Sequence, residues 1–257
     1  MWQRQKIRDY AGSYGAFPYS LKTMLKKVAS IITLLSSAIV ISSYSQAAIA
    51  TPATPDIIPQ AIAQTQTAST AKLTLEDLPP GFQELPPQFA TFLAAQLDAF
   101  KPQMAEANIQ PENFFAFFNR QNLEIVMGVT GNIPTQQQVK FDATLQKVQQ
   151  PEVQQELISK VQQRLKAFGM IEFVEYKALP DVDNLANASS GLRVGLNIQG
   201  QPLQMDVAGF RRNSVGAFTA VIYLNQKTPT LSLKEVADKL DNRILQSSPS
   251  AKLSRSH

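Results

Sequence analysis

Residues 192–224 decide the fold, and they read LRVGLNIQGQPLQMDVAGFRRNSVGAFTAVIYL. Apolar residues alternate with polar or small ones over 192–198 and 203–207, which is typical of strands with one buried face. Residues 216–224 are apolar on both faces, which indicates a central strand covered on both sides. The turns between the three runs are short, so we expect an antiparallel meander.

The rest of the globular region supplies more strands and several helices. Alternating apolar residues predict strands over 123–130 and 172–178, while apolar residues at helical spacing predict helices over 89–100, 135–148 and 153–168. Ser232 and Glu235 form a capping-box pattern that opens a last helix. We therefore expect an α+β fold: one antiparallel sheet of five or six strands with helices packed on it.

Each predicted helix has an apolar stripe that we expect to be buried. The stripe of helix 135–148 is Val139, Leu145 and Val148. The helix over 153–168 has the most regular stripe. The last helix is expected to bury Leu233, Val236, Leu240 and Ile244. The proline-rich segment 78–87 cannot form regular helix, and we expect Phe82 and Leu85 to hold it against the body.

The N-terminal region has the pattern of an export signal. Residues 24–27 read MLKK, residues 28–41 are mostly apolar, and Ala48 and Ala50 lie at −3 and −1 of a cleavage point. We expect a signal peptide over 1–50, with the true start at Met1 or Met24 and cleavage after Ala50. The apolar run is shorter than the roughly 20 residues of a spanning helix. An uncleaved membrane anchor is the alternative.

Composition divides the remainder of the chain. Residues 51–72 are rich in Thr, Pro, Ala and Gln, which predicts a disordered linker. We expect a single globular domain over 73–246 and a disordered tail over 247–257.

Charge and residue usage disfavour several classes of function. Six of the 24 basic and one of the 20 acidic residues precede Thr51, so residues 51–257 carry 18 basic and 19 acidic side chains. This near-neutral balance gives no support to nucleic-acid binding. The chain has no cysteine, and its one histidine is the last residue, His257. Disulfides, thiol chemistry, His-based catalysis and Cys or His metal sites are therefore not expected.

The C-terminal third resembles a known class of exported domain. The motifs that carry the resemblance are VEYKALP at 174–180, ASSGLRV at 188–194, MDVAGFRR at 205–212, VGAFTAV at 215–221 and ADKLDNRI at 237–244. In this order they resemble exported PsbP-like α+β domains, which include PknH-type sensor domains and LpqN-type lipoproteins. The cysteine-free, Gln-rich composition is similar to that of secreted cyanobacterial proteins. The resemblance implies binding, sensing or assembly, and it supplies no catalytic motif.

Two clusters are candidate interaction sites. Four phenylalanines, Phe114, Phe115, Phe117 and Phe118, cannot all share one face of a strand or helix, so they are a candidate interaction patch. The alternative is a segment packed between two layers. Arg211 and Arg212 are a candidate anion contact, although adjacent strand residues face opposite ways and a solvated hairpin tip is the alternative.

The acidic residues give no clear catalytic or metal site. Asp206 is expected to pair with Arg193 or Arg211 across the meander. Glu172 and Glu175, three apart on a strand, are expected on opposite faces, which would make a poor acid–base pair. The loop that starts at Asp181 lacks the glycine and final glutamate of a calcium loop. We expect neither a catalytic residue, a metal nor another cofactor.

These observations favour an exported, non-enzymatic binding or accessory protein in the periplasm, the thylakoid lumen or the medium. Its expected partner is an envelope or membrane protein complex, or a small apolar ligand. Two alternatives remain: an exported hydrolase with a carboxylate-based site, and a membrane-tethered structural module that keeps its signal anchor.

Overall fold

The computed structural model describes residues 71–87, 110–166, 171–198 and 200–247, together with positions 91 and 95. Its strands are β1 (Phe82–Glu84), β2 (Gln110–Asn119), β3 (Glu124–Asn132), β4 (Ile171–Ala178), β5 (Ala188–Ile198), β6 (Gln201–Arg212) and β7 (Val215–Leu224). Its helices are α3 (Thr135–Lys147), α4 (Pro151–Lys166) and α5 (Leu233–Ser247), with 3-10 turns η1 (Leu75–Asp77) and η2 (Pro180–Val182). The expected helix over 89–100 lies outside the described residues, except that Thr91 and Ala95 are helical.

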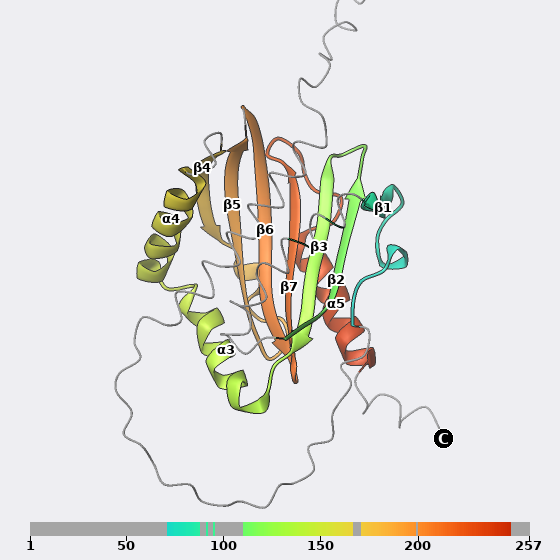
Figure 1. Cartoon of the computed structure of the whole chain (residues 1–257), viewed down its shortest axis with the longest axis vertical. Coiled ribbons are helices and arrows are strands. Elements are labelled where there is room, and N and C mark those ends of the chain that lie inside the picture. Colours follow the sequence, from blue (N-terminus) through green and yellow to red (C-terminus); the bar gives the residue numbers. More distant parts are fainter. Residues whose placement is uncertain are drawn as a thin grey trace, which may run out of the picture.

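The described strands form one antiparallel sheet in the order β1-β2-β3-β7-β6-β5-β4 (Figure 1). The α+β class is confirmed, and so is the meander of β5, β6 and β7, with β7 in the centre. The predicted count of five or six strands is wrong, because β1 and β2 add to the sheet beyond β3. β2 contains the phenylalanine run, whose apolar residues on both faces hide the two-residue period of a strand.

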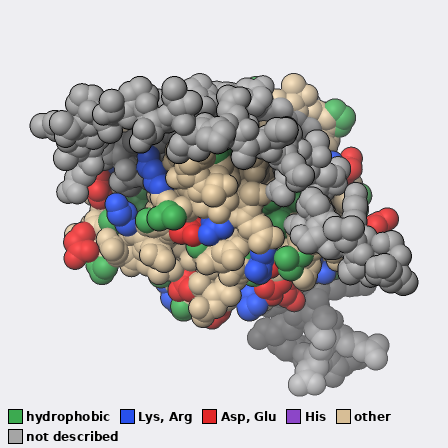
Figure 2. Space-filling view, turned by 90° about the horizontal axis from the view of Figure 1, so that it is seen from below, with side chains coloured by type: hydrophobic (Ala, Val, Ile, Leu, Met, Phe, Trp, Pro, Cys, Tyr) green, Lys and Arg blue, Asp and Glu red, His purple; other side chains and the backbone are tan. Residues whose placement is uncertain are grey.

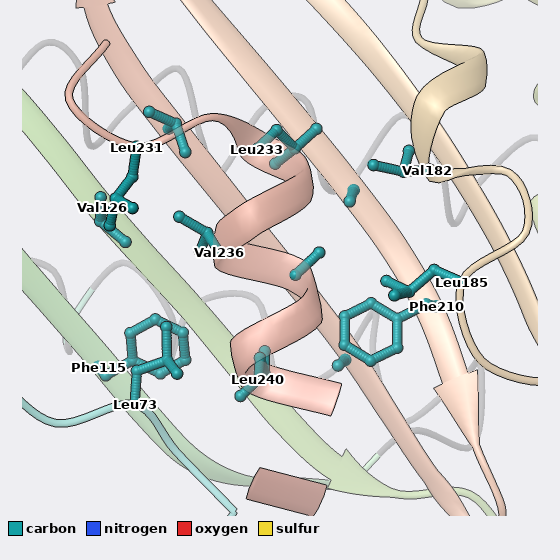
Figure 3. Close-up of a cluster of buried hydrophobic side chains, with 14 of the residues drawn as sticks. Leu73, Phe115, Val126, Val182, Leu185, Phe210, Leu231, Leu233, Val236 and Leu240 are labelled. Carbon is teal, nitrogen blue, oxygen red and sulfur yellow. The ribbon is translucent and has the colours of Figure 1, made fainter. Parts of the chain in front are cut away.

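One face of the sheet is covered by α5, which packs on β6 and β7 (Figures 1 and 3). The capping box is present, since Glu235 N–H donates to Ser232 Oγ at 3.2 Å and Ser232 N–H donates to the Glu235 carboxylate at 2.8 Å. The expected stripe of α5 is buried in full, and Ala237 and Asp241 are buried with it. Figure 3 shows Val236 and Leu240 of α5 pointing toward this core.

The opposite face is covered by α3 and α4, which pack on β4, β5 and β6 (Figure 1). The α4 stripe places Leu157 and Val161 in the core, as expected. In α3, Leu145 is buried as predicted, but Val139 is 79% exposed and Phe141 is buried in its place. Residues that are two positions apart in an α-helix are separated by about 200° around the helix axis. Once Phe141 faces the sheet, Val139 therefore faces solvent.

The N-terminal described segment closes the α5 side. Leu73 is 1% exposed and Ala71 is 5% exposed, so both belong to the core, and Ala71 lies two residues before the predicted domain start at Leu73. The hydroxyl of Thr130 on β3 donates to the Ala71 carbonyl at 2.8 Å. Leu85 is buried and Phe82 packs against the core, as expected for the proline-rich segment.

Candidate functional site

The phenylalanine run lies within β2, and most of it is core. Phe115 and Phe117 point into the α5 side, where their rings stack at 6.0 Å, while Phe118 belongs to the opposite core. All three side chains are 3–4% exposed, and Phe114 is half-buried. The arrangement matches the packing alternative, in which the segment lies between two layers. Burial of the three rings stabilises the fold, and a role of this segment as an interaction patch stays a prediction.

Arg211 and Arg212 end strand β6 and are each paired with an aspartate of a helix. Arg211 Nε donates to Asp142 of α3 at 2.7 Å, and Arg212 Nε donates to Asp241 of α5 at 2.7 Å. In both pairs Nη2 donates to the second carboxylate oxygen, so both pairs are bidentate. The two arginines face opposite sides of the sheet, as predicted, and attach one helical layer on each side.

A third arginine–aspartate pair joins the C-terminal helix to the N-terminal segment. Arg243 of α5 donates to Asp77 of η1 at 2.8 Å, and Asp77 also accepts the Thr74 N–H at 2.8 Å. Figure 2 shows basic and acidic side chains lying next to one another at the end of the molecule that is lowest in Figure 1. With their carboxylate partners in place, Arg211 and Arg212 serve here as layer-to-layer contacts, and anion binding by them stays a prediction.

A different polar cluster lies on the α5 side of the sheet, toward the β5–β6 turn. Arg193 of β5 faces Asp206 of β6, with Nε–Oδ1 at 2.6 Å and Nη2–Oδ2 at 2.7 Å. This confirms the expected cross-strand pair. The Tyr223 hydroxyl of β7 lies 3.1 Å from Asp206 Oδ2 and 3.0 Å from Gln204 Oε1. Arg193 also lies 6.0 Å from the centre of the Tyr223 ring.

Burial differs sharply within this cluster. The Asp206 side chain is 5% exposed, whereas that of Arg193 is 28% exposed. The hydrogen-bonded carboxylate raises the pKa of Arg193, which therefore stays charged. Burial first, and then the Asp206 charge, raise the pKa of Tyr223 to about 12, so its hydroxyl keeps its proton at neutral pH. The cluster is a fixed set of charges with a guanidinium at the surface.

The exposed side chains of β4 extend this cluster toward the edge of the sheet. The predicted opposite orientation of Glu172 and Glu175 is wrong. Glu172 pairs with Asn197 and Glu175 with Gly195, so both face the α5 side. A bulge between Phe173 and Glu175 adds one residue to β4, and this extra residue places the Glu175 side chain on the same face of the sheet as that of Glu172. Asn197 donates to Glu172 at 3.1 Å.

These side chains form what we name the polar face. It comprises Glu172, Glu175 and Lys177 of β4, Arg193 and Asn197 of β5, and Gln204 and Asp206 of β6. Of the described α-helices, α5 lies on this side of the sheet, and it packs on β6 and β7 rather than on β4 and β5. Gln204 and Tyr223 were not singled out from the sequence. Gln204 lies two residues from Asp206, and Tyr223 lies two residues from Val221, on predicted strands. Residues two apart on a strand lie on the same face, and this was the signal that the sequence offered.

The loop after β4 is polar and is tied to its neighbours. Asp183 accepts a hydrogen bond from Gln149 at 2.8 Å, and Asn187 accepts the Asn213 N–H at 2.7 Å. Within the described ranges, no group of three or more His, Cys, Asp or Glu side chains is arranged to hold a metal ion. The hydrogen bonds of Asp183 and Asn187 connect this loop to the end of α3 and to the β6–β7 hairpin.

The predicted cleavage position, Ala50, lies outside the described residues. Across the part of the chain that the structure covers, no helix has the length and hydropathy needed to span a membrane. No protein-family model matches the chain, and no curated protein matches it.

Proposed function

We propose that this chain is an exported, non-enzymatic accessory protein of the PsbP-like type, which binds a protein partner of the envelope through the polar face. The observation that carries the proposal is the set of exposed charged side chains on β4, which lies beside the partly buried Arg193 of β5 and its buried partner Asp206. The export signal pattern at Met24 to Ala50 supports a location outside the cytoplasm.

The chemistry of the polar face favours a protein over a small apolar ligand. Glu172, Glu175 and Lys177 are exposed and carry both signs of charge, and Arg193 adds a half-exposed guanidinium held in place by two hydrogen bonds. Charged groups held in fixed positions give specificity and faster association with a surface of complementary charge. An apolar ligand would have to remove water from these groups without replacing their hydrogen bonds.

Charge reversal on the polar face tests the binding role. The full chain, tagged at its C-terminus, is purified from the envelope of its host alongside Glu175→Lys and Lys177→Glu. The matched control is Glu84→Lys, because Glu84 is also exposed and lies in β1 at the opposite edge of the sheet. We expect one partner protein that co-purifies with the unmodified chain and the control, and at several-fold lower yield with the other two variants. Equal recovery with all four proteins contradicts the proposal.

Export is tested separately by sequencing the N-terminus of the purified protein. A first residue at Thr51 supports a cleaved signal. An intact leader in the membrane fraction supports the tethered alternative, which would contradict the exported form proposed here.

A further inference from the structure

Strand β4 forms one edge of the sheet among the described residues. Among the described strands, β5 is its one neighbour. Five of its eight residues are exposed, and Val174 in the bulge is 60% exposed. A strand at an edge has a row of backbone N–H and C=O groups that no neighbour satisfies, and such a row can pair with another strand.

The register shows which backbone groups of β4 face outward. The Leu179 N–H donates to the Gly191 carbonyl at 2.9 Å, so the backbone N–H and C=O groups of residue 179 point toward β5. Backbone groups alternate along a strand, so those of Lys177 and Glu175 also point toward β5, whereas those of Tyr176 and Ala178 point away from β5, toward the open edge. Because the Gly191 carbonyl points toward β4, alternation along β5 makes the backbone groups of Asn197 point toward β4 as well. Asn197 pairs with Glu172, so the backbone groups of Glu172 point toward β5 and those of Ile171 and Phe173 point away.

This pattern is complementary to itself. If two copies of β4 run antiparallel with Phe173 opposite Tyr176, then Ile171 lies opposite Ala178, and all four residues direct backbone groups at the partner. The same register places Glu172 opposite Lys177 twice, once on each side of the twofold axis. The bulge adds one residue to both strands alike, so the ladder resumes in register beyond it.

Side-chain faces agree with the same register. Glu172 and Lys177 both lie on the polar face, opposite Asn197 and Arg193 of β5. Phe173 and Tyr176 both pack on the α4 side. Sliding one copy of β4 by two residues along the other gives two less favourable registers. One of them brings Glu172 opposite Glu175. The other brings Glu175 opposite Tyr176, whose side chain lies on the opposite face of the sheet. Like charges directly opposite each other are unfavourable.

The geometry points to a second copy of this chain as the partner of β4, in an antiparallel pair that joins the two sheets into one. Opposite-charge pairs and main-chain hydrogen bonds both hold this contact together. The polar faces of the two copies then lie side by side on one surface. This inference does not depend on the partner protein proposed above, since it concerns the edge of β4 alone.

Cysteine cross-linking of the full chain tests the register, because the natural sequence has no cysteine to interfere. Glu172→Cys and Lys177→Cys are prepared with different tags, mixed and oxidised. Residues 172 and 177 would form a non-hydrogen-bonded pair, in which Cα atoms lie about 4.5 Å apart. A disulfide can bridge that distance. We expect a covalent dimer that carries both tags in the mixture, and little covalent dimer from either variant alone.

Two control mixtures make the test decisive. Glu84→Cys with Lys177→Cys measures random collision, because Glu84 lies on the other edge strand. Glu175→Cys with Lys177→Cys reports a pairing centred on Tyr176 instead. The inference is overturned if the first mixture gives no more mixed dimer than the Glu84 control, or if the Glu175 mixture cross-links in preference to it.

Reversible association provides a second readout. In sedimentation experiments we expect the unmodified chain to dimerise as its concentration rises. Lys177→Glu and Glu172→Lys should each weaken the dimer about tenfold, because each turns two attractive pairs into two repulsive ones. The double variant Glu172→Lys/Lys177→Glu should recover most of the lost dimer affinity, because exchanging the two residues again places opposite charges across from each other. A chain that stays monomeric throughout, or a double variant as weak as the single ones, contradicts the pairing.

Discussion

Asp206 lies directly opposite Arg193 on the neighbouring strand and accepts two hydrogen bonds from its guanidinium, at 2.6 and 2.7 Å. The carboxylate is nearly buried, and the guanidinium reaches the surface. This one contact positions the cation of the polar face. It also connects that face to the core through Tyr223, which packs with the residues under α5.

Removing one member of this pair should destabilise the fold more than removing both. Arg193→Met leaves the Asp206 carboxylate buried without its main partner, which should lower the free energy of unfolding by about 3 kcal/mol. Arg193→Met/Asp206→Leu replaces both charges with apolar groups and should lose less than the single change. Urea unfolding of Arg193→Met, Asp206→Leu and the double variant measures the coupling free energy between the two side chains. Additive losses would show that the two side chains do not interact.

The two arginine contacts at the end of β6 should act independently. Arg211→Met frees Asp142 of α3, and Arg212→Met frees Asp241 of α5, on opposite sides of the sheet. Since they share no hydrogen-bond partner, their effects on the free energy of unfolding should add within about 0.5 kcal/mol. Arg212→Met should cost more, because Asp241 is 8% exposed and Asp142 is 24% exposed. Denaturant melts of both single variants and the double variant would reveal any coupling.

Acid should weaken the contact between η1 and α5. Burial alone would raise the pKa of Asp77, but hydrogen bonds from Arg243 and from the Thr74 backbone hold that pKa below its ordinary value of 3.8. The stabilisation is therefore present above pH 3.8 and is lost as the pH falls through the lowered pKa. Asp77→Asn should be less stable than the natural chain at neutral pH, and the difference should shrink in acid. A pH series of thermal melts that keeps a constant difference would contradict this assignment.

Gly191 is required by the packing of η2 against β5. A Cβ atom at this position would lie 2.1 Å from Val182 Cγ2 and 2.9 Å from the Leu179 carbonyl oxygen. Gly191→Ala should therefore cost about 1–3 kcal/mol, as expected for overpacking. Val182→Ala removes the nearest atom, so the double variant should lose less than the sum of the two single losses. Gly200→Ala is an unsuitable control because of its positive φ, and Glu84→Ala serves instead.

The sequence predicts the C-terminal half of the fold better than the N-terminal half. In β5, β6 and α5 the apolar period is regular, and a capping box marks where α5 begins, so local pattern and tertiary packing agree. β1 has three residues between prolines, and β2 has phenylalanine on both faces, so neither shows the alternation of a half-buried strand.

The candidate site was predictable where it depends on direct cross-strand neighbours. The Arg193–Asp206 pair follows from the meander. The shared face of Glu172 and Glu175 does not, because a bulge of one residue reverses a two-residue period and has no mark in the sequence at Val174. Likewise, the aspartate partners of Arg211 and Arg212 lie 69 and 29 residues away on helices, and no local pattern connects them.

Photo-cross-linking in the host cell tests the central claim most directly, namely that the polar face contacts a partner protein. A photoreactive residue is placed at Glu175, and a matched one at Val139, which is exposed on α3 on the other side of the sheet. We predict one cross-linked partner from position 175 that is absent from position 139. A cross-link to a second copy is recognised by its mass and counts toward the β4 pairing alone. The same products from both positions, or no heterologous product from position 175, would contradict the account.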